Sequence, residues 1–283
     1  MRRLLFLAIP LSALALTATA TGGRTVAGAS CPTVSDGVFT VGTDNPAYPP
    51  WFGGTPTKGS KWKVSEPTSG KGFESAVAYA VAKQLGYPKA KVVWKYVPFA
   101  KSYAPGKKPF DVDINEISVT PARAKVVDFS SSYYDVAQAV VANKGTPAAS
   151  VRSLAGLRKL RLGVQLGTTS YDAIKNQIKP SSQPRVYDTN DKAVFALKSK
   201  QIDGLVVDLP TAFYVTAVQV PSSKIVGQLA TKPGGEHFGM VLQNGSPLTA
   251  CVNRALAKLK ANGTLKKIQA TWLSKVVGVP VLR

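Results

Sequence analysis

The chain has 283 residues, of which 45% are hydrophobic and 18% are charged, which excludes a disordered chain or a coiled coil and suits one or two folded domains. Its formal net charge of +21 at pH 7 raises the question of nucleic-acid binding. The lysines, however, are spread along the whole chain, and no zinc-finger spacing or RNP-type motif accompanies them. We therefore expect a basic solvated surface and no nucleic-acid partner.

The N-terminal residues have the composition of a secretory signal peptide. Arg2 and Arg3 precede a mostly apolar stretch at 4–16, and small residues follow at 27–29. The apolar stretch is too short for a membrane-spanning helix, which needs about 20 residues. We expect residues 1–30 to be removed and the mature protein to act in the periplasm or at the outer face of the cytoplasmic membrane.

The two cysteines, Cys31 and Cys251, have two alternative fates. Outside the cytoplasm they can form a disulfide. The small residues at 28–30 also partly fit a lipoprotein signal, in which Cys31 would become a lipid-anchored N-terminus. The two fates compete for one sulfur, and a disulfide is favoured because Cys251 would otherwise be an odd exported thiol.

The first half of the mature chain alternates strand and helix patterns. Apolar residues recur at helical spacing from Phe73 to Leu85, and Gly86 follows as a stop signal. Residues 53–70 are rich in Gly, Ser, Thr, Pro and Lys and are expected to form a loop. Strands are expected at 38–42, 91–97, 111–119 and 134–142.

A second unit begins near residue 143, after a polar connection. Its alternation of strands and helices is typical of a parallel-sheet α/β unit. Strands are expected at 160–164, 185–187, 203–207 and 238–242, and helices at 151–157, 170–178, 191–199, 209–218, 248–259 and 265–277.

Five segments, in order, resemble the bacterial extracellular solute-binding proteins, family 3, which bind amino acids for ABC importers. The most specific is Ser-Val-Thr-Pro-Ala-Arg at 118–123 with its continuation to Ser130. The others lie at 41–51, 163–170, 203–208 and 259–268. The resemblance covers nearly all of residues 38–272.

The resemblance implies a type II periplasmic-binding-protein-like α/β fold, with two lobes, two hinge strands and a ligand cleft between them. Lobe 1 would comprise residues 31–141 plus 239–283, and lobe 2 residues 142–238. The hinge strands would lie near Val140–Val141 and Phe238–Gly239. We expect a monomer that binds a free amino acid, closes on it and delivers it to an ABC importer permease.

The same resemblance implies which residues hold the ligand's carboxylate. Arg123 matches the family's carboxylate clamp, and a guanidinium fork suits that planar anion. Ser118 would add its amide and hydroxyl. Thr168 and Thr169 lead from a strand into a helix, where backbone amides can face an anion, although simple helix capping is an alternative.

Asp208 matches the family's partner for the ligand ammonium, since a buried ammonium requires a carboxylate. It ends a strand of the second unit, where parallel sheets bind ligands. Its alternative role is to cap the following helix, because Leu209-Pro210 comes next.

The ligand's side chain would meet Tyr48 and Phe99, which match the family's stacking positions, with Trp51 nearby. Asp44 lies at the end of the first strand, where side-chain specificity is often set. Aromatic residues at such positions are also common in protein cores.

The sequence departs from the family pattern at two places. Glu116, after Asn115, stands where Gly or Ser is frequent. If it faces the cleft, an additional negative charge would favour a basic amino acid, and the alternative is a local pair with lysine. Gly72-Phe73-Glu74-Ser75 replaces the usual Gly-Phe-Asp-x-Asp, which affects helix capping.

The main rival function is an enzyme on the same scaffold. Cyclohexadienyl and arogenate dehydratases resemble this family, and a cleft acid such as Glu116 could serve as a general acid. A hydrolase is disfavoured because the chain has one histidine, His237, and no nucleophile elbow. We expect no catalytic residues, no metal site and no cofactor, and a sensory or adhesive module is a third alternative.

Overall fold

The structure is a computed structural model that describes residues 31–232 and 234–283. The expected signal peptide lies outside the described residues. No helix in these two ranges is both long and apolar enough to cross a membrane. The helices are α1 (Phe73–Gln84), α2 (Phe99–Ser102), α3 (Leu154–Leu157), α4 (Thr169–Ala173), α5 (Asn190–Lys198), α6 (Leu209–Tyr214), α7 (Leu248–Ala261) and α8 (Thr264–Leu273). Short π-helical segments extend α4 through Ile178 and α6 through Gln219.

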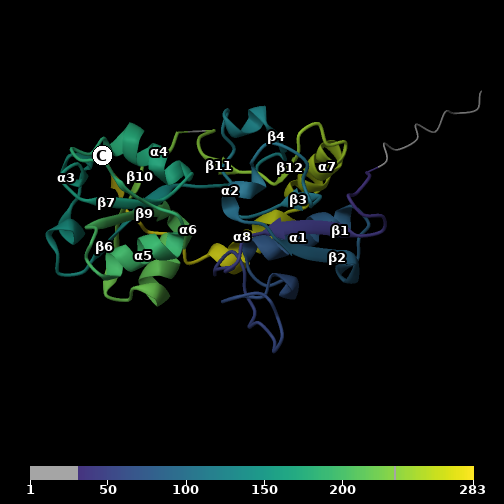
Figure 1. Ribbon diagram of the computed structural model, residues 1–283, viewed down its shortest axis with the longest axis horizontal. Coiled ribbons are helices and arrows are strands. Elements are labelled where there is room, and N and C mark those ends of the chain that lie inside the picture. Colours follow the sequence, from purple (N-terminus) through teal and green to yellow (C-terminus); the bar gives the residue numbers. More distant parts are fainter. Residues whose placement is uncertain (1–30, 233) are drawn as a thin grey trace, which may run out of the picture. The chain divides into compact units, whose positions relative to one another are not determined.

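The first sheet has five strands in the order β2-β1-β3-β12-β4. They are β1 (Phe39–Thr43), β2 (Val92–Tyr96), β3 (Val112–Asp113), β4 (Val127–Phe129) and β12 (Val241–Gln243). β1 runs parallel to β2 and β3, whereas β12 is antiparallel to β3 and β4. The apolar faces of α1, α7 and α8 pack on this sheet (Figure 1) and bury Phe39, Phe73 and Leu256 completely.

The second sheet has six strands in the order β13-β10-β6-β9-β7-β8. They are β6 (Gln138–Asn143), β7 (Leu162–Gln165), β8 (Arg185–Tyr187), β9 (Gly204–Asp208), β10 (Ser223–Leu229) and β13 (Val281–Leu282). β7, β8 and β9 are mutually parallel as expected, but β6 is antiparallel to both β9 and β10, so the sheet is mixed. Helices α5 and α6 pack with β9 around Leu205 and Ala212 (Figure 1).

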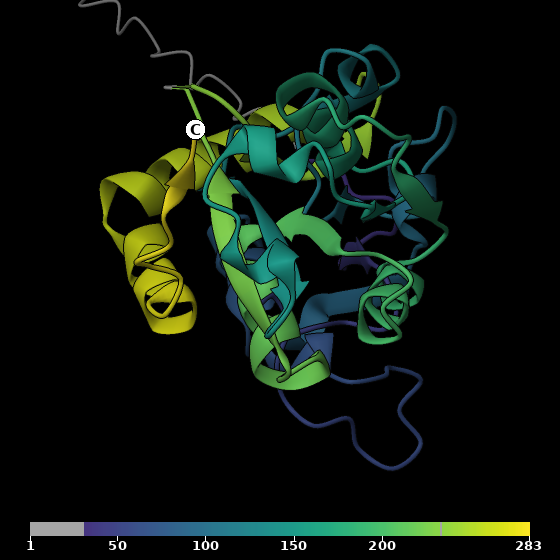
Figure 2. The ribbon, with the colours of Figure 1, turned by 90° about the vertical axis from the view of Figure 1, so that its left-hand side faces the viewer.

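Two antiparallel strands, β5 (Tyr134–Asp135) and β11 (His237–Phe238), connect the two sheets. Val140–Val141, near which the first hinge was expected, lie inside β6, which pairs along its length with β9 and β10 of the second sheet. The lobe boundary expected after residue 141 therefore falls inside β6. Residues 281–282, which were expected in lobe 1, pair with β10 of the second sheet (Figure 2).

The strand expected over 111–119 is limited to two residues of β3. Glu116 adopts a left-handed backbone conformation with φ of 53°, which a strand cannot accommodate. Ser118 resumes pairing only as an isolated bridge to Phe238. A left-handed non-glycine residue costs about 1–3 kcal/mol and is frequent at functional sites.

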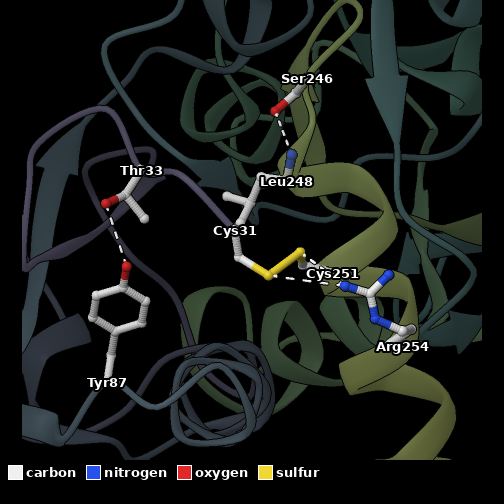
Figure 3. The surroundings of a disulfide bond; sticks show 7 residues. All are labelled: Cys31, Thr33, Tyr87, Ser246, Leu248, Cys251 and Arg254. Atoms are coloured by element: carbon white, nitrogen blue, oxygen red, sulfur yellow. Dashed lines mark hydrogen bonds between the residues drawn. A yellow bond between two sulfur atoms is a disulfide. The ribbon is translucent and has the colours of Figure 1, made fainter. Parts of the chain in front are cut away.

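The described chain begins at a disulfide between Cys31 and Cys251 (Figure 3). Cys251 is buried on α7, and the guanidinium of Arg254, one turn later, donates to its sulfur at 3.1 Å. The segment after Cys31 is fixed further by Asp111, whose two carboxylate oxygens accept the backbone N–H groups of Val34 and Thr40 at 2.6 Å each. The disulfide fate, of the two alternatives for Cys31, is the one present in the structure.

Candidate ligand-binding cleft

A cavity of about 350 Å³ lies between the two sheets, a volume that suits a small metabolite. Eight of the nine expected binding residues line it, and Ser118 lies directly behind its wall. The lining includes Asp44, Tyr48, Phe99, Glu116, Arg123, Thr168, Thr169 and Asp208.

Arg123 reaches the cavity from a tight turn after Thr120-Pro121. The Thr120 hydroxyl accepts the backbone N–H of Arg123 at 3.2 Å, which fixes the start of the turn. The guanidinium donates to the backbone carbonyls of Ser118 at 2.7 Å and Gly167 at 2.8 Å. It lies over the Tyr103 ring at 4.2 Å from the centroid. These contacts hold a buried, permanently charged fork in one orientation.

Gly167 joins the two halves of this arrangement. Its φ of +75° allows the sharp turn between β7 and α4, and a Cβ at this position would lie 2.7 Å from the Tyr103 hydroxyl oxygen. Tyr103 donates to the Gly167 carbonyl at 3.2 Å. Residues from both sheets thus meet at this turn.

Thr168 and Thr169 do not act as side-chain caps of α4. The Thr168 hydroxyl donates to the Gln165 carbonyl at 2.8 Å, and no side-chain cap bond forms. The Thr169 hydroxyl is 3.1 Å from the Ser118 hydroxyl across the cleft and also donates to Glu236. The N–H of Tyr171 donates to the Thr168 carbonyl at 3.2 Å, whereas the backbone N–H groups before it in the first turn have no intrahelical acceptor and can face an anion.

Asp208 occupies the N-cap position of α6, but its side chain makes no capping hydrogen bond. Its Oδ1 instead accepts the side-chain amide of Gln138 at 2.6 Å, from the position paired with it on β6. Burial, with the charges of Glu236 and Glu116, raises the pKa of Asp208 well above its usual range. A cation in the cavity would relieve that unfavourable environment.

Glu116 lines the cavity and does not pair with a lysine. Its Oε2 accepts the Thr211 hydroxyl at 2.6 Å, and that hydroxyl in turn accepts the indole N–H of Trp51 at 2.9 Å. Trp51 itself is a core residue that packs on Phe73, among others. Burial and the nearby carboxyl of Glu74 raise the pKa of Glu116.

Glu74 supports the floor of the cleft rather than the start of α1. It is completely buried, and its Oε1 accepts the backbone N–H of Glu116 at 2.7 Å and the hydroxyl of Tyr133. Asp113 is also completely buried, and neither its carboxylate oxygens nor Glu74 Oε2 has a hydrogen-bond partner in the described protein. Burial raises the pKa of both acids, so these carboxyl groups keep their protons to a higher pH than they would in water.

The opposite end of the cleft contains Tyr48, whose hydroxyl donates to both carboxylate oxygens of Asp191, at 2.6 and 2.5 Å. Tyr214 lies 5.8 Å from the Tyr48 ring, centroid to centroid. Asp44 accepts the backbone N–H of Phe99 at 3.3 Å, and burial raises its pKa. The side-chain oxygen of Gln219, also on the lining, has no hydrogen-bond partner in the described protein.

Five carboxyl groups and one cationic side chain face the cavity from the described residues. The cation is Arg123, and the carboxyl groups belong to Asp44, Glu116, Asp188, Asp191 and Asp208. The two side-chain ion pairs found in the ranges that the structure covers, Arg161–Asp203 and Lys192–Asp188, add no further cation to the lining. The cleft is thus acidic in a strongly basic chain, and its arrangement suits a ligand with one carboxylate and more than one cationic or hydrogen-donating group.

Several residues of the site carry no signal in the sequence. Gln138, Thr211 and Glu236 contact the expected ligand residues from positions that resemble ordinary strand, helix and loop residues. Glu74 stands out in the sequence only as a departure at the start of a helix, and Asp191 falls in an ordinary expected helix. In the described ranges, no group of three or more His, Cys, Asp and Glu residues could hold a metal ion.

The fold and the site together define a solute-binding protein with a ligand cleft between two α/β sheets. Residues 40–275 match the model of the bacterial extracellular solute-binding proteins, family 3, and the chain belongs to this family, as its motifs predicted.

Known relatives share most of the chain. ABC transporter arginine-binding protein 1 of Escherichia coli (strain K12) is 31% identical over 209 residues, covering 71% of this chain and 81% of the relative. ABC transporter glutamine-binding protein GlnH of Bacillus subtilis (strain 168) is 29% identical over 217 residues, covering 75% and 77%. The structure of an ancestral arginine-binding protein bound to glutamine superposes with a TM-score of 0.67 at 32% identity, covering 84% of this chain and 99% of the other.

Proposed function

We propose that this protein is the extracytoplasmic receptor of an amino-acid ABC importer and that its preferred ligand has a cationic side chain. The observation that carries the proposal is the charge of the cleft, which is lined by one arginine and five acidic residues, of which only Asp188 is paired with a lysine in the described chain. The E. coli relative named for arginine and the ancestral arginine-binding protein support the same ligand class.

Each charged part of such a ligand has a partner of opposite charge. Arg123, with the Ser118 and Thr169 hydroxyls and the first amides of α4, would bind the α-carboxylate. Asp208 would bind the α-ammonium. The side chain would extend between Tyr48 and Phe99 toward Asp44, Asp191 and the side-chain oxygen of Gln219.

A guanidinium suits the far end of the cleft because it presents five N–H donors in a plane and no acceptor. Asp44, Glu116, Asp191 and Gln219 present acceptors there. Glutamine is the second candidate, because the amides of Asn45, Gln165 and Gln219 also line the cavity and could bind an amide side chain.

The strand pairing suggests where one lobe ends and the other begins. We place the crossings at residues 134–137 and at β11, with the last strand, β13, as part of lobe 2.

We further propose export with removal of residues 1–30. The disulfide supports an oxidising compartment and leaves Cys31 without a free thiol for a lipid anchor. The functional unit is a monomer that docks on a membrane permease.

The test is a thermal-shift screen of the processed protein with the twenty amino acids, ornithine, citrulline and prephenate, followed by titration calorimetry. A ligand at one hundred times its Kd stabilises by about 2.7 kcal/mol, enough to raise the Tm by a few degrees. We expect arginine to bind more tightly than citrulline, its neutral isostere. Equal binding would refute the cationic preference, and turnover of prephenate to phenylpyruvate without any amino-acid response would replace the receptor by an enzyme.

A further inference from the structure

Glu236 does not line the cavity itself, but it bonds to two residues of the proposed carboxylate site, and neither the motifs nor the proposed function assigns it a role. It lies in the connection from β10 to β11, immediately before the second crossing. Its Oε1 accepts the Ser118 hydroxyl at 2.6 Å and also the Thr169 hydroxyl. The side-chain amide of Gln138 donates to both carboxylate oxygens, at 3.0 and 3.1 Å.

Two of these three donors are the hydroxyls that the proposed function assigns to the ligand's α-carboxylate. Ser118 comes from the first lobe and Thr169 from the second, and their hydroxyl oxygens are 3.1 Å apart. Glu236 Oε1 accepts from both hydroxyls, so it uses the donors that the proposed function gives to the ligand carboxylate. Glu236 therefore presents to the site the chemical group that the site recognises.

We propose that Glu236 is an internal competitor for the ligand carboxylate: its side chain occupies the Ser118–Thr169 hydroxyl pair, and the amino acid must displace it to bind. The inference rests on the proposed function. Occupation of the pair satisfies two hydroxyls from opposite lobes and so holds the cleft together without ligand. When the ligand binds, the two hydroxyls lose their bonds to Glu236 and gain bonds to the ligand carboxylate. The net gain in free energy is therefore smaller, and the affinity for the amino acid is lower.

The local structure allows the side chain to leave without moving the crossing strands. The Glu236 carbonyl accepts the backbone N–H of Val136 at 3.1 Å, so the backbone stays paired with the other crossing segment. Glu236 is only partly buried, and Gly234 and Gly235 precede it. A side-chain rotation toward solvent is enough to vacate the hydroxyl pair.

Charge repulsion indicates that the ligand carboxylate displaces Glu236 from the hydroxyl pair and does not bind beside it. A ligand carboxylate and the Glu236 carboxylate at the same two hydroxyls would repel each other across a few ångströms in a partly water-excluded site. Asp208 is already close enough for Gln138 to bridge it to Glu236, which adds a third negative group. Binding of the ligand carboxylate is consequently coupled to the departure of Glu236.

The experiment compares L-arginine with agmatine, which is arginine without its carboxylate, by calorimetry on wild type, Glu236→Gln and Glu236→Ala. Asp135→Asn is the matched control, because Asp135 is an exposed acid on the neighbouring crossing strand whose side chain accepts from Ser132 and from none of the residues assigned to the ligand. If wild type responds to glutamine rather than arginine, the pair is L-glutamine and 4-aminobutanamide. Melting curves without ligand verify that each variant folds.

We expect both Glu236 variants to bind the amino acid about tenfold more tightly relative to its decarboxylated analogue, and Asp135→Asn to leave this ratio unchanged. The ratio cancels the loss of attraction between Glu236 and the cationic groups, which both ligands share, so the change that remains reports on the ligand carboxylate. An unchanged or lower ratio in folded variants would overturn the inference and make Glu236 a structural or ligand-contacting residue. Failure of wild type to bind any amino acid would instead refute the proposed function, so the two failures are distinguishable.

Discussion

Tyr48 and Asp191, which are 143 positions apart in the sequence, meet across the mouth of the cleft through two hydrogen bonds of 2.6 and 2.5 Å. Tyr48 follows β1 in the first lobe, and Asp191 lies in the first turn of α5 in the second. Tyr48, Asp191 and Arg123 all line the same cavity. Together with the Trp51–Thr211–Glu116 chain, the Tyr48–Asp191 contact links residues on the two sides of the cavity.

Removal of the Tyr48 hydroxyl should weaken this contact while the aromatic wall remains. We expect Tyr48→Phe to raise the ligand Kd about five- to tenfold, because the hydroxyl that bonds both carboxylate oxygens of Asp191 is lost while the ring still packs near Tyr214. Titration calorimetry measures the change. Tyr171→Phe, on α4 and absent from the cavity lining, is the matched control, and an equal effect in both variants would contradict a specific closing role.

Arg123 should be irreplaceable by lysine. The Arg123→Lys variant keeps the charge but loses the planar fork and the fixed orientation over Tyr103, so we expect the Kd to rise by at least about 100-fold. Arg152→Lys is the control, since Arg152 also donates to two backbone carbonyls, those of Ala149 and Val151, but lies outside the cavity lining. Comparable losses of affinity in both variants would show that the change reports on folding rather than on the carboxylate clamp.

The sequence was informative where a residue type is required by the ligand and also belongs to a local motif. Arg123 follows a Thr-Pro turn and Asp208 ends a buried strand, so both could be matched to the family pattern, and both line the cavity. Their alternative roles could not be judged in the same way, because whether Asp208 caps α6 depends on which way its side chain points. The structure shows Gln138 as its partner instead.

Residues that act through long-range side-chain contacts could not be predicted. Glu236 meets Ser118 over a separation of 118 positions, and Glu74 meets Glu116 over 42. No periodicity marks such pairs, because in the sequence a buried acid on a helix looks like any other polar residue in an apolar pattern. The strand expected over 111–119 failed for a related reason. Its alternation of apolar residues gave no sign of the left-handed backbone at Glu116.

The buried acids beneath the cleft predict how stability depends on pH. Burial raises the pKa of Glu74 to about 8, whereas the unfolded chain has its usual value near 4.5. Between these values the folded state binds protons that the unfolded state releases, so the free energy of unfolding falls as the pH rises from about 5 to beyond 8. We expect the Tm without ligand to be highest in weak acid and to decline toward pH 9.

In Glu74→Gln, the free energy of unfolding should fall by a few kcal/mol less between pH 5 and 9 than in wild type. The neutral amide does not titrate and can still accept from the Glu116 amide and the Tyr133 hydroxyl. Asp113, Asp44 and Asp208 face the same region, so the slope should decrease without vanishing. The measurement is a series of thermal melts from pH 5 to 9. Glu66→Gln, at a site that bonds Ser60 and Thr68 instead, is the control, and equal slopes in wild type and Glu74→Gln would refute the assignment.

The disulfide should stabilise the fold without contributing to ligand binding. It joins residues 220 positions apart, and cross-links that close long loops restrict the unfolded chain most. We expect the Cys31→Ser/Cys251→Ser double variant to lose about 2–5 kcal/mol of stability in denaturant titrations. Its Kd should stay within about twofold of wild type, because neither cysteine lines the cleft.

A reducing agent added to wild type is the control for this prediction, since it breaks the same bond without changing the sequence. It should lower the stability of wild type to that of the double variant and leave the variant unaffected. Intact-mass measurement of the exported protein then separates the two fates of Cys31. A mass decrease of two hydrogens supports the disulfide, whereas an added acylglyceryl group would show that export attaches a lipid to Cys31 and leaves Cys251 as the free thiol.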